Sequence, residues 1–341
     1  MATYSGNQWL VYMGLHAAAQ GTETQNADNA LSRWNLETVN DIDFSAGVTQ
    51  EFLPRTGQKV FREEDVFTTQ NGGTYTWAFD WLVDDELILQ KLLTSVTENA
   101  DTTVAHHILG SATPSNQYQV ATSDPDYSLQ VTLVNPDSAE TRILHSAVVT
   151  ELTLSMDVAT NGGRLRASGT IWSGFRPKVG TNAVTDGSTI ARTDFPFGIF
   201  DCHAIEIAQV VQKATKSFSV TISHPAARVG FAVANSNDGE PEDYIRDRVD
   251  VTGSITVKHD SNVVGSAESL GFWLAGTSKA ILVGDEGTSA GGSATDIFIE
   301  IPYAKYTGHN VDLGSADGVF IELPFTGTAT GTNKLITLKM T

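Results

Sequence analysis

The stretch Val148–Trp172, VVTELTLSMDVATNGGRLRASGTIW, decides the fold. Apolar and polar side chains alternate along it, which is the period of a β-strand with one buried and one wet face. The string Asn161-Gly162-Gly163 interrupts the alternation and supplies residues that tolerate positive φ in a hairpin turn. We therefore predict a hairpin with one polar face. Its polar positions are Glu151, Thr153, Ser155 and Asp157 going out, and Arg164, Arg166, Ser168 and Thr170 coming back.

The C-terminal stretch Gly318–Met340, GVFIELPFTGTATGTNKLITLKM, has the same design. Here Glu322 stands between apolar Ile321 and Leu323, and alternation resumes after a Gly/Thr-rich turn. We predict a second hairpin. A polar hairpin face is typical of an ordinary β-sandwich surface, but the repetition also allows two copies of one sheet placed side by side.

The rest of the chain predicts more strands and two short helices. The first helix follows Asp84-Asp85-Glu86, because acidic residues favour a helix N-terminus and the apolar residues that follow have helical spacing. The second is indicated by Val263, Ala267, Leu270 and Leu274. A short strand is expected within Trp9–Leu15, and alternation predicts others at Asp41–Phe52, Val66–Phe79, Ser128–Val134, Lys216–Ser223, Val249–His259 and Asp296–Pro302.

The order of these elements repeats. Each half reads strand, charged loop, strand, short helix, variable loop, strand and hairpin, a period far too long for a solenoid. We interpret this as a tandem duplication of a small β domain, with chance similarity of two β domains as the alternative. The expected division is an N-terminal arm at 1–40, a first domain at 41–175, a linker at 176–195 and a second domain at 196–341. The predicted fold class is mainly β, with two tandem sandwich or half-barrel domains, each flanked by a short helix.

Composition excludes several functions. The 341 residues carry a formal net charge of −19 and a sequence pI near 4.6. Tight binding to nucleic acid is therefore not expected, since phosphate binding depends on clustered cations. Cys202 is the single cysteine, which excludes an internal disulfide. The N-terminus lacks the pattern of a signal peptide and no stretch resembles a membrane span, so we expect a protein used without secretion or membrane contact.

Motifs that could carry chemistry are weak. Gly287-Thr288-Ser289-Ala290-Gly291 matches a nucleophile-elbow string, but it lies in a Gly/Ser loop followed by a strand. His106-His107 are adjacent and would point to opposite faces of a strand. Asp238, Glu240, Glu242 and Asp243 are oxygen ligands without the ordered spacing of a calcium loop. We expect no catalytic residue, no metal and no cofactor.

The order of elements resembles a known family. SFSVTIS, an acidic loop, RVDVTGSITVKHD, a short helix, DIFIEIP and a terminal hairpin are similar to the tail tube proteins of long-tailed, siphovirus-type phages or related archaeal tailed viruses. HSAVVTELTLSMDVATNGGRLRASGTIWSGF is similar to the central hairpin of such proteins. The resemblance begins near Asp41 and rests on pattern and order. This chain departs from the simplest members in length, since they have one tube domain and it has two expected ones.

The resemblance implies a function. Sheets of neighbouring subunits would join around a lumen, and rings would stack into a tube that conducts the viral genome. Three chains would then fill a pseudo-sixfold ring of the virion tail, with DNA passing through without specific binding. Tape measure, tail terminator and baseplate proteins would be the other partners. The residues expected to line the lumen are Glu151, Thr153, Ser155, Asp157, Ser168, Thr170 and Glu322.

Two charged segments, Pro54–Asp65 and Asn235–Arg248, occupy equivalent places in the two halves. They are too long and too polar for tight turns, and long loops in compact domains are often functional. We expect them to reach the adjacent ring. The residues assigned to these contacts are Arg55, Lys59, Arg62, Glu63, Glu64, Asp238, Glu240, Asp243 and Arg246.

Two other classes of function remain open. A β-sandwich adhesin or carbohydrate-binding module on a virion or cell surface would use exposed aromatics such as Trp172 and Phe175 as a sugar platform. A hydrolase would act through the Ser289 loop.

Overall fold

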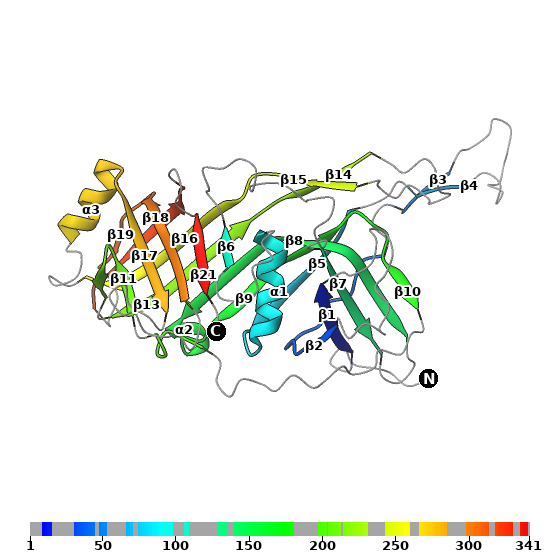
Figure 1. Ribbon diagram of the computed structural model, residues 1–341, viewed down its shortest axis with the longest axis horizontal. Coiled ribbons are helices and arrows are strands. Elements are labelled where there is room, and N and C mark those ends of the chain that lie inside the picture. Colours follow the sequence, from blue (N-terminus) through cyan, green and yellow to red (C-terminus); the bar gives the residue numbers. More distant parts are fainter. Residues whose placement is uncertain are drawn as a thin grey trace.

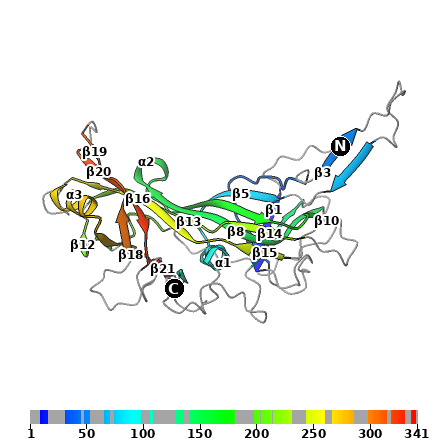
Figure 2. The same ribbon diagram turned by 90° about the horizontal axis from the view of Figure 1, so that it is seen from above.

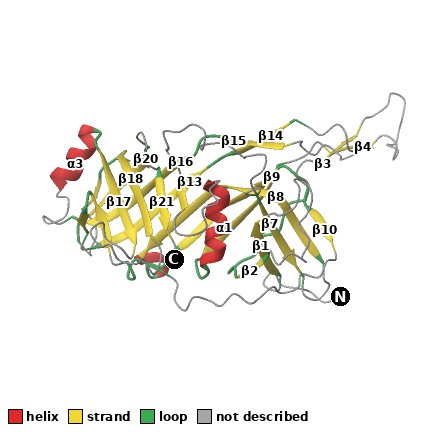
Figure 3. Cartoon of the chain, in the orientation of Figure 1, coloured by secondary structure: helices red, strands yellow, loops and turns green. Residues whose placement is uncertain are grey.

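The computed structural model describes a chain built mainly of strands (Figure 3). The helices α1 and α3 lie outside the strands, and α2 is a single short turn. The mainly β fold class is thereby confirmed. The described residues are 9–15, 31–44, 48–52, 66–70, 74–97, 106–108, 128–135, 140–180, 197–202, 204–212, 214–230, 243–259, 266–284, 298–313, 318–329 and 335–339.

The elements fall into a first half, from β1 to β10, and a second half, from β11 to β21 (Figure 1). The first half contains β1 (Leu10–Leu15), β2 (Ser32–Trp34), β3 (Val48–Phe52), β4 (Val66–Gln70), β5 (Tyr75–Leu82), α1 (Glu86–Thr97), β6 (His106–Ile108), β7 (Leu129–Val134), β8 (Thr141–Asp157), α2 (Val158–Asn161), β9 (Arg166–Ser173) and β10 (Lys178–Gly180). The second half contains β11 (Ala204–Ile207), β12 (Val210–Val211), β13 (Thr215–Ser223), β14 (Ala226–Val229), β15 (Asp243–Arg246), β16 (Asp250–Lys258), α3 (Ser266–Ala275), β17 (Ser278–Gly284), β18 (Phe298–Tyr306), β19 (Asn310–Asp312), β20 (Phe320–Gly327) and β21 (Ile336–Lys339).

One antiparallel sheet, which we call the central sheet, runs through both halves. Its strand order is β5-β9-β8-β13-β16-β20. The predicted central hairpin is confirmed, since β8 pairs with β9 and Val148 faces Trp172. Gly162 and Gly163 in its turn have φ of 61° and 77°, as the sequence predicted for this position. The two halves join where β8 pairs with β13.

The strand β8 is long enough to belong to two sheets. Its first part pairs with β7, and the part from Glu151 to Asp157 pairs with β13. Between them lies a register shift at Val149 and Glu151 in the pairing with β9. An irregularity of this kind bends a strand and changes its twist, which lets one strand serve two sheets.

The second half repeats the strand pairing of the first in the same chain order. In the first half β1 pairs with β2 and β7, β7 with β8, β8 with β9 and β10, and β9 with β5. In the second half β11 pairs with β12 and β17, β17 with β18, β18 with β20 and β21, and β20 with β16. Each half also has a separate two-stranded hairpin, β3–β4 or β14–β15, before the strand that leads to its helix. We call these hairpins the first arm and the second arm.

The predicted C-terminal hairpin is wrong. β20 and β21 do not pair with each other but lie end to end along β18, beside Ala304–Tyr306 and Phe298–Glu300 respectively. β18 extends to Tyr306, beyond the strand predicted at Asp296–Pro302. β21 therefore has β18 as its neighbour, where the sequence predicted β20. Alternation specifies which face of a strand is wet, but not which strand lies beside it.

Three local predictions change with the structure. The short strand expected in Trp9–Leu15 is confirmed as β1, but it pairs with β7 and so belongs to the folded first half rather than to a free arm. Within the predicted strand Asp41–Phe52 only Val48–Phe52 is a strand. Lys178–Gly180, in the predicted linker, pairs with β8. The domain boundaries as a whole stay a prediction.

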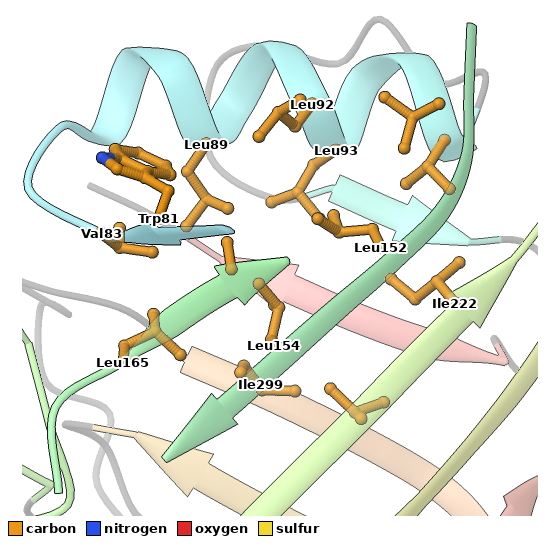
Figure 4. Close-up of a cluster of buried hydrophobic side chains, with 14 of the residues drawn as sticks. Trp81, Val83, Leu89, Leu92, Leu93, Leu152, Leu154, Leu165, Ile222 and Ile299 are labelled. Atoms are coloured by element: carbon orange, nitrogen blue, oxygen red, sulfur yellow. The ribbon is translucent and has the colours of Figure 1, made fainter. Parts of the chain in front are cut away.

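The helix α1 closes the core at the junction of the halves. Asp85 caps it, since its carboxylate accepts a hydrogen bond from the Ile88 amide at 3.2 Å. The predicted apolar stripe is fully buried, as are Leu89 and Leu93 beside it. Figure 4 shows Leu89, Leu92 and Leu93 facing Leu152 and Leu154, with Ile222 and Ile299 of the second half in the same cluster. One hydrophobic core therefore includes both halves.

Two glycines hold matching places on either side of the β8–β13 junction. Moving outward one way, Leu152 faces Gly169, and Gly169 faces Phe79. Moving outward the other way, Val220 faces Gly253, and Gly253 faces Phe325. A Cβ on Gly253 would lie 2.2 Å from the Ser219 carbonyl oxygen and 2.6 Å from the Phe325 ring. The aromatic ring occupies the space that a side chain would need, as when an aromatic residue packs over a strand glycine.

We predict that Gly253→Ala lowers the free energy of unfolding by about 1–3 kcal/mol, the usual cost of overpacking a core. The measurement is urea denaturation of the unassembled chain. Gly271→Ala is the matched control, since nothing lies within 4 Å of a Cβ at this helical position. The control should be neutral or stabilising by about 1 kcal/mol. Equal stability of both variants and the parent would contradict the account of the glycine–phenylalanine pair.

Candidate functional site

One face of the central sheet, which we call the polar face, carries hydroxyl groups across most of its width. In one row Ser168, Thr153, Thr221, Thr252 and Thr326 face one another in register from β9 to β20. All of them are partly or fully exposed, whereas the alternate residues of the same strands are largely buried in the core. Figure 2 shows α1, β18 and β21 on the other side of this sheet. The polar face is therefore a broad wet surface that spans both halves.

Hydroxyl pairs connect the strands along this face. The side-chain oxygens of Thr153 and Thr221 lie 2.8 Å apart across the junction of the halves. Those of Ser219 and Ser254 lie 3.2 Å apart within the second half. Cross-strand pairs of this kind add to the ladder of backbone hydrogen bonds.

The structure places the residues expected to line a lumen on this one face. Asp157 faces Ser217, Ser217 faces Thr256, and Thr256 faces Glu322, so that the two predicted stretches meet through strands of the second half. Whether this face lines a channel stays a prediction. The seven residues so placed are Glu151, Thr153, Ser155, Asp157, Ser168, Thr170 and Glu322.

Sequence reasoning missed half of the polar face. Thr221, Ser219, Thr252, Ser254 and Thr256 lie on it, although their strands had been predicted correctly. The signal was present as Ser/Thr at every second position of SFSVTIS and VDVTGSITVK. It could not be used without knowing that β13 and β16 continue the sheet of β8.

The charges on the polar face are mainly acidic. Asp80, Glu151, Asp250 and Glu322 are exposed there. Arg166, on β9 next to the terminal strand β5, is held by ion pairs to Asp80 at 2.9 Å and to Glu37 at 3.2 Å. Its charge is thus offset locally. Lys258 is exposed at one end of the face, opposite Phe320, and elsewhere the face as described offers hydroxyl groups and carboxylates to solvent. Such a surface repels phosphate at short range.

Asp157 has a second, local role. Its carboxylate accepts a hydrogen bond from the Ala159 amide at 2.8 Å and caps α2, the short turn that connects β8 to β9. A substitution at Asp157 therefore changes the turn as well as the charge of the face.

The residues assigned to inter-ring loops are only partly described. Arg55, Lys59, Arg62, Glu63, Glu64, Asp238 and Glu240 lie outside the described residues, as does the side chain of Asp243. The segment Asn235–Arg248 was expected to be a loop, but its end forms β15, which pairs with β14. The strands predicted on either side of Pro54–Asp65 contain β3 and β4, which pair with each other.

Arg246 has contacts within the chain rather than at the tip of a loop. Its guanidinium donates to the backbone oxygens of Ser95 and Val149, and to that of His224 at 2.9 Å. His224 Nδ1 lies 2.8 Å from the Val96 oxygen at the end of α1. We call Arg246 and His224 the latch. It binds the base of the second arm to α1 and β8 of the first half.

Burial favours the neutral form of His224 in the latch. Removal from water and the positive charge of Arg246 lower the pKa of His224 to about 4. The imidazole is therefore neutral near pH 7 and donates Nδ1–H to the Val96 oxygen. A protonated His224 would place two cations side by side in a buried site.

The predicted sugar platform is not formed. Trp172 and Phe175 are both buried. Trp172 packs edge-on against Tyr244 of β15, with ring centroids 6.3 Å apart, and Phe175 lies beside His145. The second arm covers the part of β9 that contains Trp172. Alternation along β9 does not reveal this cover, so the sequence predicted an exposed Trp172.

The other candidate motifs offer no assembled site. Ser289 lies outside the described residues, as do the side chains of His106 and His107. His309, the histidine that follows Ser289 in the chain, bonds to the Ser269 hydroxyl at 3.0 Å. Within the described ranges, no three His, Cys, Asp or Glu side chains gather as metal ligands. No helix among the described elements is long and apolar enough to span a membrane.

Comparison with known protein families gives a match over most of the chain. The family model described as phage tail tube protein matches residues 5–327, which is nearly the whole chain. No curated protein matches the sequence.

We predict that His224 makes stability depend on pH. The unfolded chain binds a proton with a pKa near 6.5 and the folded chain only near 4, so stability is complete above about pH 6.5 and falls between these values. The loss is at most about 3 kcal/mol. Denaturant titrations of the unassembled chain at pH 7 and pH 4.5 should show it.

His224→Gln should reduce this difference, because a glutamine amide can donate to the Val96 oxygen without titrating. His259→Gln, at an exposed histidine, should leave the difference intact. The same pH dependence in His224→Gln as in the parent would show that another group is responsible.

Proposed function

Because the chain belongs to the phage tail tube protein family, and is thus a structural component of the virion tail, we propose that its polar face forms the wall of the tube lumen. In this role the chain polymerises as stacked rings in a siphovirus-type tail and conducts the genome during ejection. The polar face carries this proposal, because it is continuous through both halves and opposite the core. Family membership favours such a structural role over catalysis.

The chemistry of the polar face suits passage without binding. Tight contact with DNA requires cations that displace the counterions of phosphate. Here hydroxyl groups predominate, and the positive charge of Arg166 is offset by Asp80 and Glu37. A wet, acidic wall keeps the DNA hydrated and does not hold it.

We further propose that the chain is a tandem duplication of one tube domain. The repeated strand pairing supports this, as does the matching place of the two arms and the two helices. Joining β8 to β13 puts two sheets edge to edge within one chain. Three such chains would give six sheets around one axis, and closure would leave no sheet edge exposed.

The tips of the two arms are proposed to contact the neighbouring ring. Both arms are hairpins separate from the central sheet, and the first arm projects from the end of the molecule (Figure 1). Tape measure, tail terminator and baseplate proteins are the further partners that a tail tube requires.

We predict that rings contain three chains. Mass photometry of isolated rings should give about 110 kDa, three times the 36.5 kDa of one chain. A reconstruction of assembled tubes should show pseudo-sixfold symmetry with two alternating domains. Rings of six chains, at about twice that mass, would contradict the proposal.

We predict that Glu151→Lys with Glu322→Lys slows DNA release from virions at low salt. Both side chains are exposed on the polar face, so the variant should still assemble, but cations in the wall would hold phosphate. Asp157 is left unchanged because it caps α2. Release is followed by the fluorescence of a DNA-binding dye.

Glu151→Gln with Glu322→Gln is the matched control, since it removes the same charges without adding cations. It should release DNA at nearly the parent rate. The delay of the lysine variant should shrink as ionic strength rises. Release at the parent rate in low salt would place these residues outside the channel.

A further inference from the structure

The helix α3 presents an apolar stripe to solvent. Leu270, Trp273 and Leu274, three and four residues apart on one side of the helix, are 36%, 39% and 71% exposed. Its other side faces the protein, where Ser269 is buried and bonds to His309. Soluble proteins rarely leave a run of large apolar side chains on a helix unless something covers it.

The helix α1, at the corresponding place in the first half, shows what covers such a stripe. Its apolar residues Ile88, Leu89, Leu92, Leu93 and Val96 are all fully buried. Part of that burial comes from the second half, since Ile222 of β13 and Ile299 of β18 lie in the same cluster (Figure 4). The latch of the second arm then binds the end of α1. The following half therefore completes the environment of this helix.

The strand β19, which lies beside α3, also differs from the corresponding part of β8 in the first half. In β8 the edge opposite β9, from Glu151 to Asp157, is covered by β13 of the following half. The strand β19 pairs with β20 as β8 pairs with β9, but no strand among the described elements pairs with its other edge. All of β19 is exposed, and Leu313 directly after it is 79% exposed. His309, just before β19, connects this strand to α3.

We propose that this end of the molecule, defined by Leu270, Trp273 and Leu274 of α3 with Val311 and Leu313 at β19, binds the first half of a second copy of the chain. The proposal rests on the ring proposed above and names the surface that closes it. The first arm of the second copy binds the end of α3 as the second arm binds the end of α1. The segment before that arm lies along the edge of β19 opposite β20.

The shape of the chain supports this occupant. Figures 1 and 2 show α3 and β19 at one end of the long axis, and the first arm at the other. The contact is therefore head-to-tail, and repeated copies form a closed ring if the rotation closes. It also covers an apolar surface and a strand edge beside which no described strand lies, both of which favour association.

Cross-linking between two different copies tests the contact. Both chains carry Cys202→Ser to remove the native thiol. One carries Leu274→Cys on α3, and the other carries Gln70→Cys at the end of β4, the position that matches Arg246 at the end of β15. After mixed assembly and treatment with a short bis-maleimide, a covalent dimer should form from the mixture and from neither chain alone.

The matched control replaces Gln70→Cys with Phe200→Cys. Phe200 is 73% exposed, and its ring lies next to Gly163, just after the α2 turn, which is away from both ends of the molecule. No dimer is expected from this mixture. Dimer formation with Phe200→Cys to the same extent as with Gln70→Cys would overturn the proposed contact.

A charge introduced on α3 tests the same contact independently, with ring formation as the readout. Leu274→Glu should leave the chain folded by circular dichroism, since an exposed position costs little stability, but rings should be lost. Phe200→Glu should form rings as the parent does. If the parent forms rings while Leu274→Glu still assembles and Gln70→Cys gives no dimer, this interface is wrong and the tube function stands. If the parent forms no rings, the proposed function itself fails, and the interface with it.

Discussion

The structure depends on the hydrogen-bonded join between β8 and β13. A strand edge carries unpaired backbone donors and acceptors, and such an edge must be paired, covered or charged to avoid uncontrolled association. Here the last part of β8 is paired with β13, and this pairing turns two half sheets into the central sheet. Everything else that unites the halves follows from it: a shared core beneath the sheet and a continuous polar face above it.

The same join explains the unequal helices. α1 lies where the halves meet, so strands of the second half and the latch complete its burial. α3 lies at one end of the long axis, away from this junction, and its outer stripe is exposed. The two helices hold corresponding places in the repeated strand pairing, and they differ in exposure because only α1 lies at the junction of the halves.

The polar face and the latch use polar groups in different ways. On the polar face, hydroxyl groups can exchange partners with water, so their presence costs little stability. In the latch, His224 and Arg246 bond to backbone oxygens under cover of the second arm, where an unmet hydrogen bond would be costly. The first is suited to a surface along which another molecule moves, and the second to a fixed junction.

The sequence by itself determined the mainly β class, the central hairpin with its wet and buried faces, the glycine turn and the capped helix α1. These features depend on period-two alternation, positive φ and local capping, which act between residues close in the chain. Only the tertiary structure decided that β20 pairs with β16 rather than β21, that Trp172 is covered by Tyr244, and that Arg246 belongs to a latch. Each of these depends on which distant strand becomes a neighbour. Alternation does not specify that neighbour, because any strand with a matching buried face satisfies the same pattern.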